Sequence, residues 1–313
     1  RDNLGDWSSD VCSSDLGVYS SPHLLRYNER VQLNGVEATD EQLCEAFAAL
    51  DAGRGEISLT YFEMGTLAAF WLFERAHLDV VVLEVGLGGR LDTVNVVDAD
   101  LALVTSIGVD HVDYLGDTRE SVAYEKAGIF RQGRPALCGD LDPPQTLLDK
   151  VRELDCPFFL RGREFNLEVG AEHWQWRGRD ARGQLVELHD LPLLNLPMEN
   201  AALALQAYLL LGLPWDPAQI ARTLLATRIV GRLDRRAFDW QGKRLNLLLD
   251  VGHNPHAAEY LAQRLSRTAP VGRRLAVFGL LADKDLEGVV APLLANVQRS
   301  EEHTSELQSP RLS

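Results

Sequence analysis

The sequence predicts an α/β fold, with a mainly parallel sheet in its larger N-terminal part and a smaller α/β domain after it. Short runs rich in Val and Leu alternate with segments whose apolar residues recur at helical spacing, a pattern typical of parallel sheets. The pattern also restarts late in the chain. The length of 313 residues, 46% of them hydrophobic, suffices for two domains of about 150 residues each.

The first part contains two helical patterns and then a run of β-branched residues. Thr39 and Gln42 form a capping-box signature before one helix, and residues 62–77 predict a second, largely buried helix. Residues 79–85 (DVVVLEV) predict a strand covered on both faces, followed by a glycine-rich turn. The remaining elements of this part are another covered strand at 101–107, helices at 118–130 and 143–154, and short strands at 135–139 and 157–160.

Residues 161–190 interrupt this alternation. They contain Trp174 and Trp176 in short alternating segments separated by glycines, which predicts a small antiparallel excursion. The elements expected after it are helices at 198–211 and 217–226, then strand 245–250, helix 256–266, strand 274–279 and helix 284–296. The restart after Gly231 predicts a domain boundary there, with one domain at 17–230 and an incomplete second domain at 232–298.

The two ends differ from the rest of the chain. Residues 1–16 (RDNLGDWSSDVCSSDL) and 299–313 (RSEEHTSELQSPRLS) are polar and rich in Ser, without strand or helix periodicity. Both resemble translated sequencing-adapter read-through, and a pair of disordered tails is the alternative. We exclude both ends from the fold prediction.

Composition excludes several classes of partner. The net charge of −15 argues against a broad nucleic-acid footprint, and no apolar run approaches the ~20 residues that span a bilayer. No signal segment opens the chain, so we expect a cytoplasmic protein without membrane or nucleic-acid partners. The four cysteines (Cys12, Cys44, Cys138 and Cys156) have no C-x-x-C spacing, which fits a reducing compartment.

Candidate functional residues follow the predicted strands, because ligands of open parallel sheets bind at the carboxyl ends of strands. Glu84 stands before the turn GLGGR, where a carboxylate suits a magnesium ion, although it could simply cap backbone amides. His111 follows the next strand and could reach the same crevice, or be structural. Lys126 could bind phosphate, or lose its proton and form a carbamate with carbon dioxide. A solvated helix Lys is its simpler interpretation.

Other candidates lie upstream and in the second domain. The hydroxyls of Ser20 and Ser21 could complete a magnesium shell, although Ser-Pro is also a common turn. The aromatic residues of the segment 60–63 (TYFE) could stack on a flat heterocycle or pack in the core. Asp250 ends a strand, where it could hold ribose hydroxyls, and His253 follows it. Arg232 stands at the predicted hinge and could reach ATP phosphates.

Together these segments resemble one family. The motifs are SSPHL, LTYFE, LEVGLGGRLD, VTSIGVDH, EKAGIF, MENAALAL, LDVGHNPHAAEYL and GLLADKD, and they cover about residues 17–298. They resemble the bifunctional dihydrofolate synthase/folylpolyglutamate synthases, which belong to the ATP-dependent Mur-type amide ligases. The resemblance implies a P-loop-type ATPase domain and a Rossmann-like C-terminal domain. It also implies an enzyme that joins L-glutamate to dihydropteroate or to the glutamyl tail of reduced folates, through an acyl phosphate.

The resemblance also implies roles for individual residues. Magnesium ligands match Ser21, Glu84 and His111, and a carboxylated lysine matches Lys126. ATP contacts match Asn200, Arg232 and Asp250, and His253 matches a position at the active site. Pteroate contacts match Thr60, Tyr61, Phe62, Glu63, Leu91, Asp92 and Thr93. Two Mg²⁺ ions, ATP as co-substrate and a monomeric state are expected as well.

One departure from the family pattern concerns activity. No G-x-x-G-K-[ST] phosphate loop precedes SSPHL in these 313 residues. Without its backbone amides and Lys the β- and γ-phosphates lose their cradle, so we expect this chain to be inactive although its parent protein is a ligase. The alternatives are another Mur-type amide ligase, acting on a peptidoglycan precursor, and a non-catalytic remnant that binds pterins or a partner protein.

Overall fold

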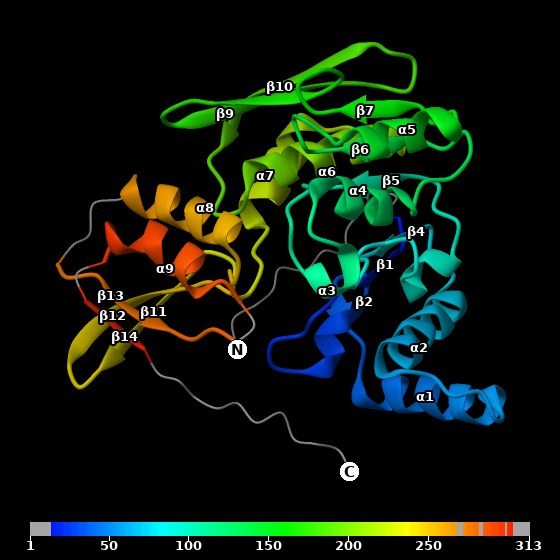
Figure 1. The fold of residues 1–313 in the computed structure, drawn as a ribbon, viewed down its shortest axis with the longest axis horizontal. Helices are drawn as coiled ribbons and strands as arrows, with labels where there is room; N and C mark the ends of the chain where they lie inside the picture. The colour runs from blue at the N-terminus through cyan, green and yellow to red at the C-terminus, as the bar shows by residue number, and fades with distance from the viewer. Residues whose placement is uncertain (1–13, 268–271, 282–283, 298, 303–313) are drawn as a thin grey trace. The chain divides into compact units, whose positions relative to one another are not determined.

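The computed structural model describes residues 14–267, 272–281, 284–297 and 299–302, which form two compact units (Figure 1). Unit 1 comprises Arg1–Ile107 and Asp113–Phe159. Unit 2 comprises Gly108–Val112 and Leu160–Ser313. The segment Gly108–Val112 therefore belongs to unit 2 although the chain on both sides of it belongs to unit 1.

Unit 1 contains a four-stranded sheet of order β3-β2-β1-β4. The strands are β1 (Leu16–Tyr19), β2 (Val31–Leu33), β3 (Val36–Glu37) and β4 (Val80–Leu83), with the 3-10 helix η1 (Tyr27–Arg30) before β2. β1 and β4 are parallel, and Tyr19 pairs with Leu83, whereas β1 and β2 are antiparallel. The parallel pair brings the residues that follow β1 and β4 to the same edge of the sheet.

Two long helices pack with this sheet. The helix α1 (Asp40–Arg54) begins at a capping box in which Gln42 N–H donates to Thr39 Oγ1, as the sequence predicts. The helix α2 (Tyr61–Ala76) buries Ala68, Leu72 and Phe73. These side chains share one core cluster with Tyr19 of β1, which is fully buried. The core therefore holds Tyr19, the last residue of β1, in place where the strand ends.

A second sheet of unit 1 has the order β5-β6-β7. Its strands are β5 (Ala102–Val104), β6 (Ala136–Cys138) and β7 (Phe158–Leu160), and β5 and β6 are parallel. The remaining elements of the unit are η2 (Thr93–Val96), α3 (Val112–Leu115), α4 (Arg119–Ala127) and α5 (Gln145–Glu153). Helix α4 packs against α5 and ends at Gly128, inside the predicted helix 118–130.

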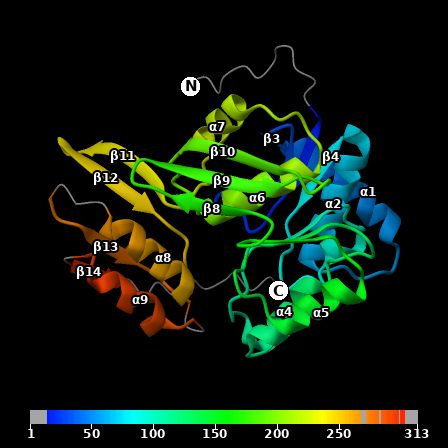
Figure 2. The same ribbon diagram turned by 90° about the horizontal axis from the view of Figure 1, so that it is seen from above.

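Unit 2 begins with the predicted antiparallel excursion (Figure 2). Its strands β8 (Asn166–Val169), β9 (His173–Arg179) and β10 (Leu185–Pro192) form a sheet of order β10-β9-β8. Trp174 and Trp176 alternate inward from β9, and the Trp176 indole donates to Ala202 O at 3.0 Å. Ala202 lies in α6 (Met198–Leu210), which is followed by α7 (Pro217–Ala226). The sheet is thus fixed to α6 through a buried indole.

The last part of unit 2 contains a hairpin, two helices and a parallel strand pair. The hairpin joins β11 (Asp234–Trp240) to β12 (Lys243–Leu249). Helices α8 (Pro255–Ser266) and α9 (Leu286–Leu294) pack on each other. The strands β13 (Leu275–Phe278) and β14 (Arg299–Glu302) are parallel. Helix α8 begins with Pro255 at its first position and Asn254 as its N-cap, a favoured pair for a sharp helix start.

The structure corrects four expectations. β4 is not covered on both faces, since the adjacent side chains of Val81 and Val82 are 42% and 51% exposed. Among the described strands, β4 pairs with β1 alone and forms an edge of its sheet. β1 begins at Leu16, the last residue of the excluded N-terminal segment, because its backbone pairs with β4. β11 is a strand that the sequence analysis missed, since its residues include four charges and only three apolar side chains. β14 lies in the segment 299–313, where no strand was expected, and it pairs with β13.

Candidate functional site

The side chains of Ser21 and Glu84 follow β1 and β4 at one edge of the sheet. Glu84 N–H donates to Tyr19 O at 2.9 Å, which extends the strand pairing by one step. Ser21 N–H then donates to Glu84 Oε2 at 2.8 Å. Glu84 is solvent-exposed, so its carboxylate keeps lone pairs that no backbone group uses. The hydrogen bond brings together two residues that the family resemblance implies as magnesium ligands, and that role stays a prediction.

The donor atoms at this edge suit a hard divalent cation. A carboxylate and a hydroxyl supply oxygen ligands, which Mg²⁺ prefers. Within the described residues, no group of three or more His, Cys, Asp or Glu side chains is arranged to hold a metal ion. The predicted set contains two such residues, Glu84 and His111, with Ser21 as the third ligand. His111 belongs to unit 2, and its place beside Ser21 and Glu84 stays a prediction.

Asp92 shapes the glycine-rich turn that follows Glu84. Its Oδ2 accepts hydrogen bonds from the N–H groups of Gly86 and Leu87, both at 3.0 Å. Its Oδ1 accepts from Val94 N–H at 2.9 Å, which caps η2. The neighbouring Leu91 is 79% exposed. Asp92 is therefore a structural organiser of the turn, and Leu91 is the residue of this segment that presents apolar surface.

The turn packs tightly on the C-terminal end of α4. Gly89 has φ 153°, and a Cβ there would lie 2.8 Å from Ile129 Cγ2 and 3.0 Å from Glu125 O. Arg90 N–H donates to the same carbonyl of Glu125 at 2.8 Å, and the Arg90 guanidinium pairs with the Glu125 carboxylate at 2.9 Å. Only glycine fits at position 89 without displacing the helix end. The turn thus reaches the helical residue just before Lys126.

Lys126 lies in the last turn of α4 and is partly buried. Burial lowers the pKa of its ammonium group. Within the described residues, no acidic side chain pairs with this ammonium. Desolvation without a counter-ion favours the neutral amine, which is the form that reacts with carbon dioxide to give a carbamate. The geometry is therefore compatible with the chemistry implied for this lysine.

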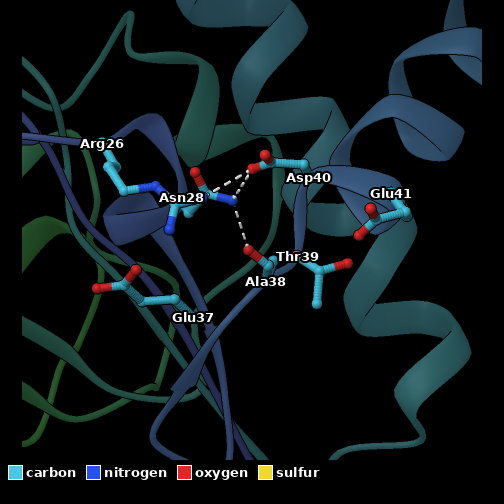
Figure 3. A pocket seen from close by; sticks show the side chains of 7 residues that line it. All are labelled: Arg26, Asn28, Glu37, Ala38, Thr39, Asp40 and Glu41. Carbon is cyan, nitrogen blue, oxygen red and sulfur yellow. Dashed lines mark hydrogen bonds and ion pairs between the residues drawn. The ribbon is translucent and has the colours of Figure 1, made fainter.

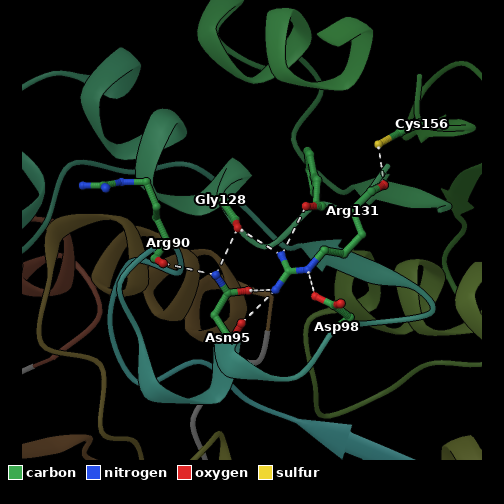
Figure 4. A network of polar contacts seen from close by, with 7 residues as sticks. Arg90, Asn95, Asp98, Gly128, Arg131 and Cys156 are labelled. Carbon is green, nitrogen blue, oxygen red and sulfur yellow. Dashed lines mark hydrogen bonds and ion pairs between the residues drawn. The ribbon is translucent and has the colours of Figure 1, made fainter. Parts of the chain in front are cut away.

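A polar network holds the segment after the turn against the end of α4 (Figure 4). Asn95 Nδ2 donates to Arg90 O at 3.1 Å and to Gly128 O at 3.0 Å. The Arg131 guanidinium donates to Asn95 O and Oδ1 and pairs with Asp98. These bonds satisfy backbone carbonyls at a helix terminus, where such groups otherwise lack partners. The network ties the segment after the turn to Gly128, two residues after Lys126.

The segment 60–63 has two roles in the structure. Thr60 and Glu63 form a reciprocal capping box at the start of α2, and the hydrogen bond from Thr60 N–H lowers the pKa of Glu63. The Phe62 ring packs behind the turn, where a Cβ on Gly86 would lie 2.5 Å from its Cζ. Tyr61 is 65% exposed. Of this segment, Tyr61 is the residue whose ring is most available to a ligand.

In unit 2, Asp250 contacts the backbone of Leu233, the residue that follows Arg232. Asp250 accepts from Leu233 N–H at 2.9 Å and from Gly252 N–H at 2.8 Å. Leu233 is buried and has φ 46°, a left-handed conformation that bulky residues avoid. The contact with Asp250 therefore holds a strained backbone, and the neighbouring Arg232 is exposed. His253 Nδ1 lies 3.0 Å from Val251 O, which leaves its Nε2 outside that contact.

Asn200 stands in the first turn of α6 and is exposed, with no described hydrogen bond from its side chain to Arg232 or Asp250. A neighbouring link comes from Tyr260 of α8. Burial raises the pKa of Tyr260, and the carboxylates of Glu199 and Asp250 contribute in the same direction. The Tyr260 hydroxyl is buried without a described partner. The carboxylates of Glu199, which precedes Asn200, and of the ribose candidate Asp250 therefore both influence the pKa of Tyr260.

The structure reveals contacts of Asp110 and Lys284 that sequence analysis did not assign. Asp110 Oδ1 lies 3.3 Å from Lys284 Nζ, and Asn254 Nδ2 lies 3.4 Å from Asp110 Oδ2. Burial raises the pKa of Asp110, but hydrogen bonds from His111 N–H and Lys284 outweigh it and leave a lowered pKa. The sequence contains Asp110 next to His111 and Lys284 in the motif GLLADKD. The sequence analysis gave neither Asp110 nor Lys284 a role.

Two pockets in the described residues lie away from these candidates. One of about 270 Å³ is lined by residues around the start of α1, where Asn28 Nδ2 donates to Ala38 O and Asp40 Oδ1 (Figure 3). The other, of about 520 Å³, is lined in part by Arg235, Arg264 and Arg267. No residue of the predicted site lines either pocket.

No helix within the described part of the chain is long and apolar enough to cross a membrane.

Two domain families match the chain. The Mur ligase middle domain matches residues 39–159, and the glutamate ligase domain of Mur ligases matches residues 231–301. A relative named dihydrofolate synthase/folylpolyglutamate synthase, from Haemophilus influenzae, is 44% identical over 287 residues. The match covers 88% of this chain and 64% of the relative, so the chain spans less than two thirds of that protein.

Solved structures match across most of the described fold. E. coli FolC in complex with DHPP and ADP is similar with a TM-score of 0.84 and 46% identity, over 92% of this chain and 67% of that one. The bifunctional folylpolyglutamate synthase/dihydrofolate synthase from Yersinia pestis, complexed with AMPPNP and a Mn ion, is similar with a TM-score of 0.82 and 45% identity. That match covers 92% of this chain and 67% of the other.

Proposed function

Because this chain belongs to the dihydrofolate synthase/folylpolyglutamate synthase family of Mur ligases, we propose that it is part of an ATP-dependent glutamate ligase. Its acceptor is dihydropteroate, the glutamyl tail of a reduced folate, or both. The observation that carries the proposal is the contact of Ser21 with Glu84 at the carboxyl edge of β1 and β4. Family membership adds the expectation that this edge binds substrate phosphate through a cation.

The proposed reaction activates a carboxylate that is otherwise a poor acyl donor. A carboxylate oxygen of the folate substrate attacks the γ-phosphorus of ATP, and ADP leaves with the electrons of the broken P–O bond. The neutral amine of L-glutamate then attacks the acyl carbon of the acyl phosphate. Inorganic phosphate leaves, and the amine loses a proton as the amide forms. Water must be excluded, since it would hydrolyse the acyl phosphate.

Ser21, Glu84 and His111 are the proposed metal ligands, and Lys126 as a carbamate is the proposed anionic group beside them. Bound Mg²⁺, for which we propose two sites, supplies charge neutralisation of the phosphoryl oxygens. The carboxylate of Glu84 is pre-oriented by Ser21 N–H, so little reorganisation is needed on binding. Partial burial of Lys126 supports the carbamate, because the lowered pKa increases the fraction of reactive amine.

The residues that match pteroate contacts form two groups. Some have exposed side chains, and the others hold the exposed residues in place. We propose that Tyr61 stacks on the flat ring system and that Leu91 covers one of its faces, since both are largely exposed. Asp92 and Thr93 follow in the turn, whose shape Asp92 determines. Phe62 and Glu63, with Thr60, hold the start of α2 in place through packing and capping.

Asn200, Arg232 and Asp250 are the proposed ATP contacts, with Asp250 on the ribose and Arg232 on the phosphates. The position of exposed Arg232 beside strained Leu233 supports a role in domain movement, because strain is often stored at switch regions. His253 is the proposed active-site histidine of this half. We also propose the division into domains 17–230 and 232–298. The monomeric state, the cytoplasmic location, the origin of the two ends and the inactivity of this chain stay predictions.

A substrate panel tests the proposed function. Isothermal titration of the chain with dihydropteroate, in the presence of Mn²⁺ and AMPPNP, is expected to show saturable binding that Tyr61→Ala abolishes. Trp240 of β11, which is 60% exposed, provides the control, because Trp240→Ala removes an exposed aromatic ring to which no role in the proposed site is given. A UDP-muramoyl peptide is expected not to bind. Binding of that precursor instead of dihydropteroate would assign the chain to another Mur-type reaction.

A further inference from the structure

The segment Gly108–Val112 carries Asp110 and His111 and is part of unit 2. The preceding strand β5, which ends at Val104, belongs to unit 1. The residues Gly108–His111 form no helix or strand, and α3 begins only at Val112, so this stretch needs specific side-chain contacts to keep one position. The contacts that could do so are those of Asp110.

The carboxylate of Asp110 reaches the N-terminal ends of two helices. Its Oδ1 is 3.3 Å from the Lys284 ammonium, which stands just before the N-cap of α9. Its Oδ2 accepts from Asn254, the N-cap of α8, at 3.4 Å. The partners lie 174 and 144 residues away in the chain. The positive end of the α8 dipole favours a carboxylate beside its N-cap.

The ion pair is more buried than most others in the structure. The side chains of Lys284 and Asp110 are 13% and 28% exposed. By contrast, the pair Arg152–Asp149 of α5 has both side chains at least 60% exposed. Exposed pairs of that kind contribute little to stability, whereas removing one partner of a buried pair leaves an uncompensated charge. Loss of Lys284 therefore has a structural cost for the segment around Asp110.

His111 depends on Asp110 for its own conformation. Its N–H donates to Asp110 Oδ1 at 2.8 Å, and its φ is 53°, in the left-handed region. That conformation is uncommon for residues other than glycine and needs support from its surroundings. The same carboxylate oxygen thus holds the Lys284 ammonium and the backbone of His111.

We propose that Asp110, Lys284 and Asn254 form a latch that fixes the segment 108–112 on unit 2 and sets the orientation of His111. Lys284 and Asn254 are then positioning residues, which act on the metal ligand through Asp110 and do not touch the metal. The latch stands on the contacts alone. Its effect on metal binding rests on the proposed function, in which His111 is a ligand.

Hydrogen exchange of the full chain tests the latch. Lys284→Met is expected to speed exchange of the amides in 108–112 by about tenfold, because a local contact is lost. Peptides from β5, α8 and α9 should keep their protection, which shows that the variant is folded. Lys284→Arg keeps the ion pair and should restore slow exchange. Lys150→Met, which breaks the short-range pair with Glu153 on α5, serves as control. Unchanged exchange of 108–112 in Lys284→Met overturns the latch.

Titration with Mn²⁺ tests the positioning role. Lys284→Met is expected to weaken Mn²⁺ binding by about tenfold or more, and Lys284→Arg to recover it, as for residues that orient a ligand from behind. Faster exchange in Lys284→Met with unchanged Mn²⁺ affinity contradicts the role of Lys284 in positioning His111. If the wild-type chain binds no Mn²⁺ while the exchange results hold, the latch stands and the proposed function fails.

Discussion

The backbone N–H of Ser21 donates a hydrogen bond to the carboxylate of Glu84, which lies 63 residues further along the chain. The contact follows from the parallel register of β1 and β4, in which Tyr19 pairs with Leu83. Two residues beyond Tyr19 and one beyond Leu83, the chain turns away and leaves these groups at the sheet edge. A strand pairing thereby brings the backbone of Ser21 and the carboxylate of Glu84 together at one edge of the sheet.

Glu84→Gln is expected to weaken Mn²⁺ binding by about tenfold or more, because the amide is a poorer ligand than a carboxylate for a hard cation. The amide oxygen can still accept from Ser21 N–H, so Tm should change little. Calorimetric titration and thermal unfolding measure the two effects. The control is Glu74→Gln on α2, whose carboxylate is 83% exposed. Equal Mn²⁺ affinity in wild type and Glu84→Gln would remove Glu84 from the metal site.

Lys126→Met is expected to raise Tm at pH 7. Burial lowers the pKa of Lys126, so the folded state binds fewer protons than the unfolded state between its folded pKa and the ordinary value of about 10.4. Stability of the wild type therefore rises with pH across that window, and the advantage of methionine should shrink as the pH approaches about 10. Thermal unfolding in carbonate-free buffer measures this, with Lys150→Met as control. A gain that stays constant with pH contradicts the desolvated lysine.

Carbamate formation at Lys126 has a direct spectroscopic test. Carbon-13 spectra of the chain in labelled bicarbonate are expected to show a carbamate signal that Lys126→Met lacks. The reason is that partial burial without a counter-ion favours the reactive amine. Lys150→Met should retain the signal. A carbamate that persists in Lys126→Met belongs to another amine and would contradict the role given to Lys126.

Asp92→Ala is expected to lower the free energy of unfolding by about 1–3 kcal/mol, since the N–H groups of Gly86, Leu87 and Val94 lose their acceptor. The loosened turn should also weaken dihydropteroate binding. Chemical denaturation measures the first effect and calorimetry the second. Asp100, whose pair with Arg134 is largely exposed, provides the control substitution Asp100→Ala. A neutral effect of Asp92→Ala would show that the turn holds its shape without it.

Gly89→Ala is expected to destabilise the chain by about 1–3 kcal/mol, because alanine avoids φ 153° and its Cβ meets Ile129 and the Glu125 carbonyl. Gly53→Ala is the matched control in α1, where a Cβ meets no atom within 4 Å. There the substitution should stabilise by about 0.5–1 kcal/mol through helix propensity. Equal effects at both positions would refute the close packing of the turn on α4.

Much of the fold follows from local sequence patterns. The helices α1 and α2, the turn after Glu84 and the antiparallel sheet around Trp176 lie where periodicity and capping predict them. The missed strands have two causes. β1 and β14 are defined by pairing with segments elsewhere in the chain, whereas β11 pairs with the adjacent β12 and its own residues do not alternate clearly. The exposure of Val81 depends on the neighbours that β4 has in the folded chain. A local run of apolar residues does not predict those neighbours.

In the candidate site, too, some features follow from local sequence patterns and others depend on contacts between distant segments. Glu84 was singled out because it follows a predicted strand, whereas its contact with Ser21 depends on the pairing of β1 with β4, which the sequence analysis did not predict. The capping role of Thr60 had a sequence signal, the pattern T-x-x-E at 60–63, to which no such role was given. The turn-shaping role of Asp92 depends on backbone geometry that residue types alone do not reveal. Lys284 was missed because its partner Asp110 lies 174 residues away and belongs to a segment that leaves its own unit.

The most direct measurement is the pulsed electron paramagnetic resonance spectrum of Mn²⁺ bound to the wild-type chain. The account predicts nuclear modulation from one histidine nitrogen, lost in His111→Gln and retained in His253→Gln. It also predicts that Glu84→Gln lowers the bound fraction. A bound Mn²⁺ without histidine coupling, or with coupling that survives His111→Gln, would contradict a metal site that joins His111 to Ser21 and Glu84.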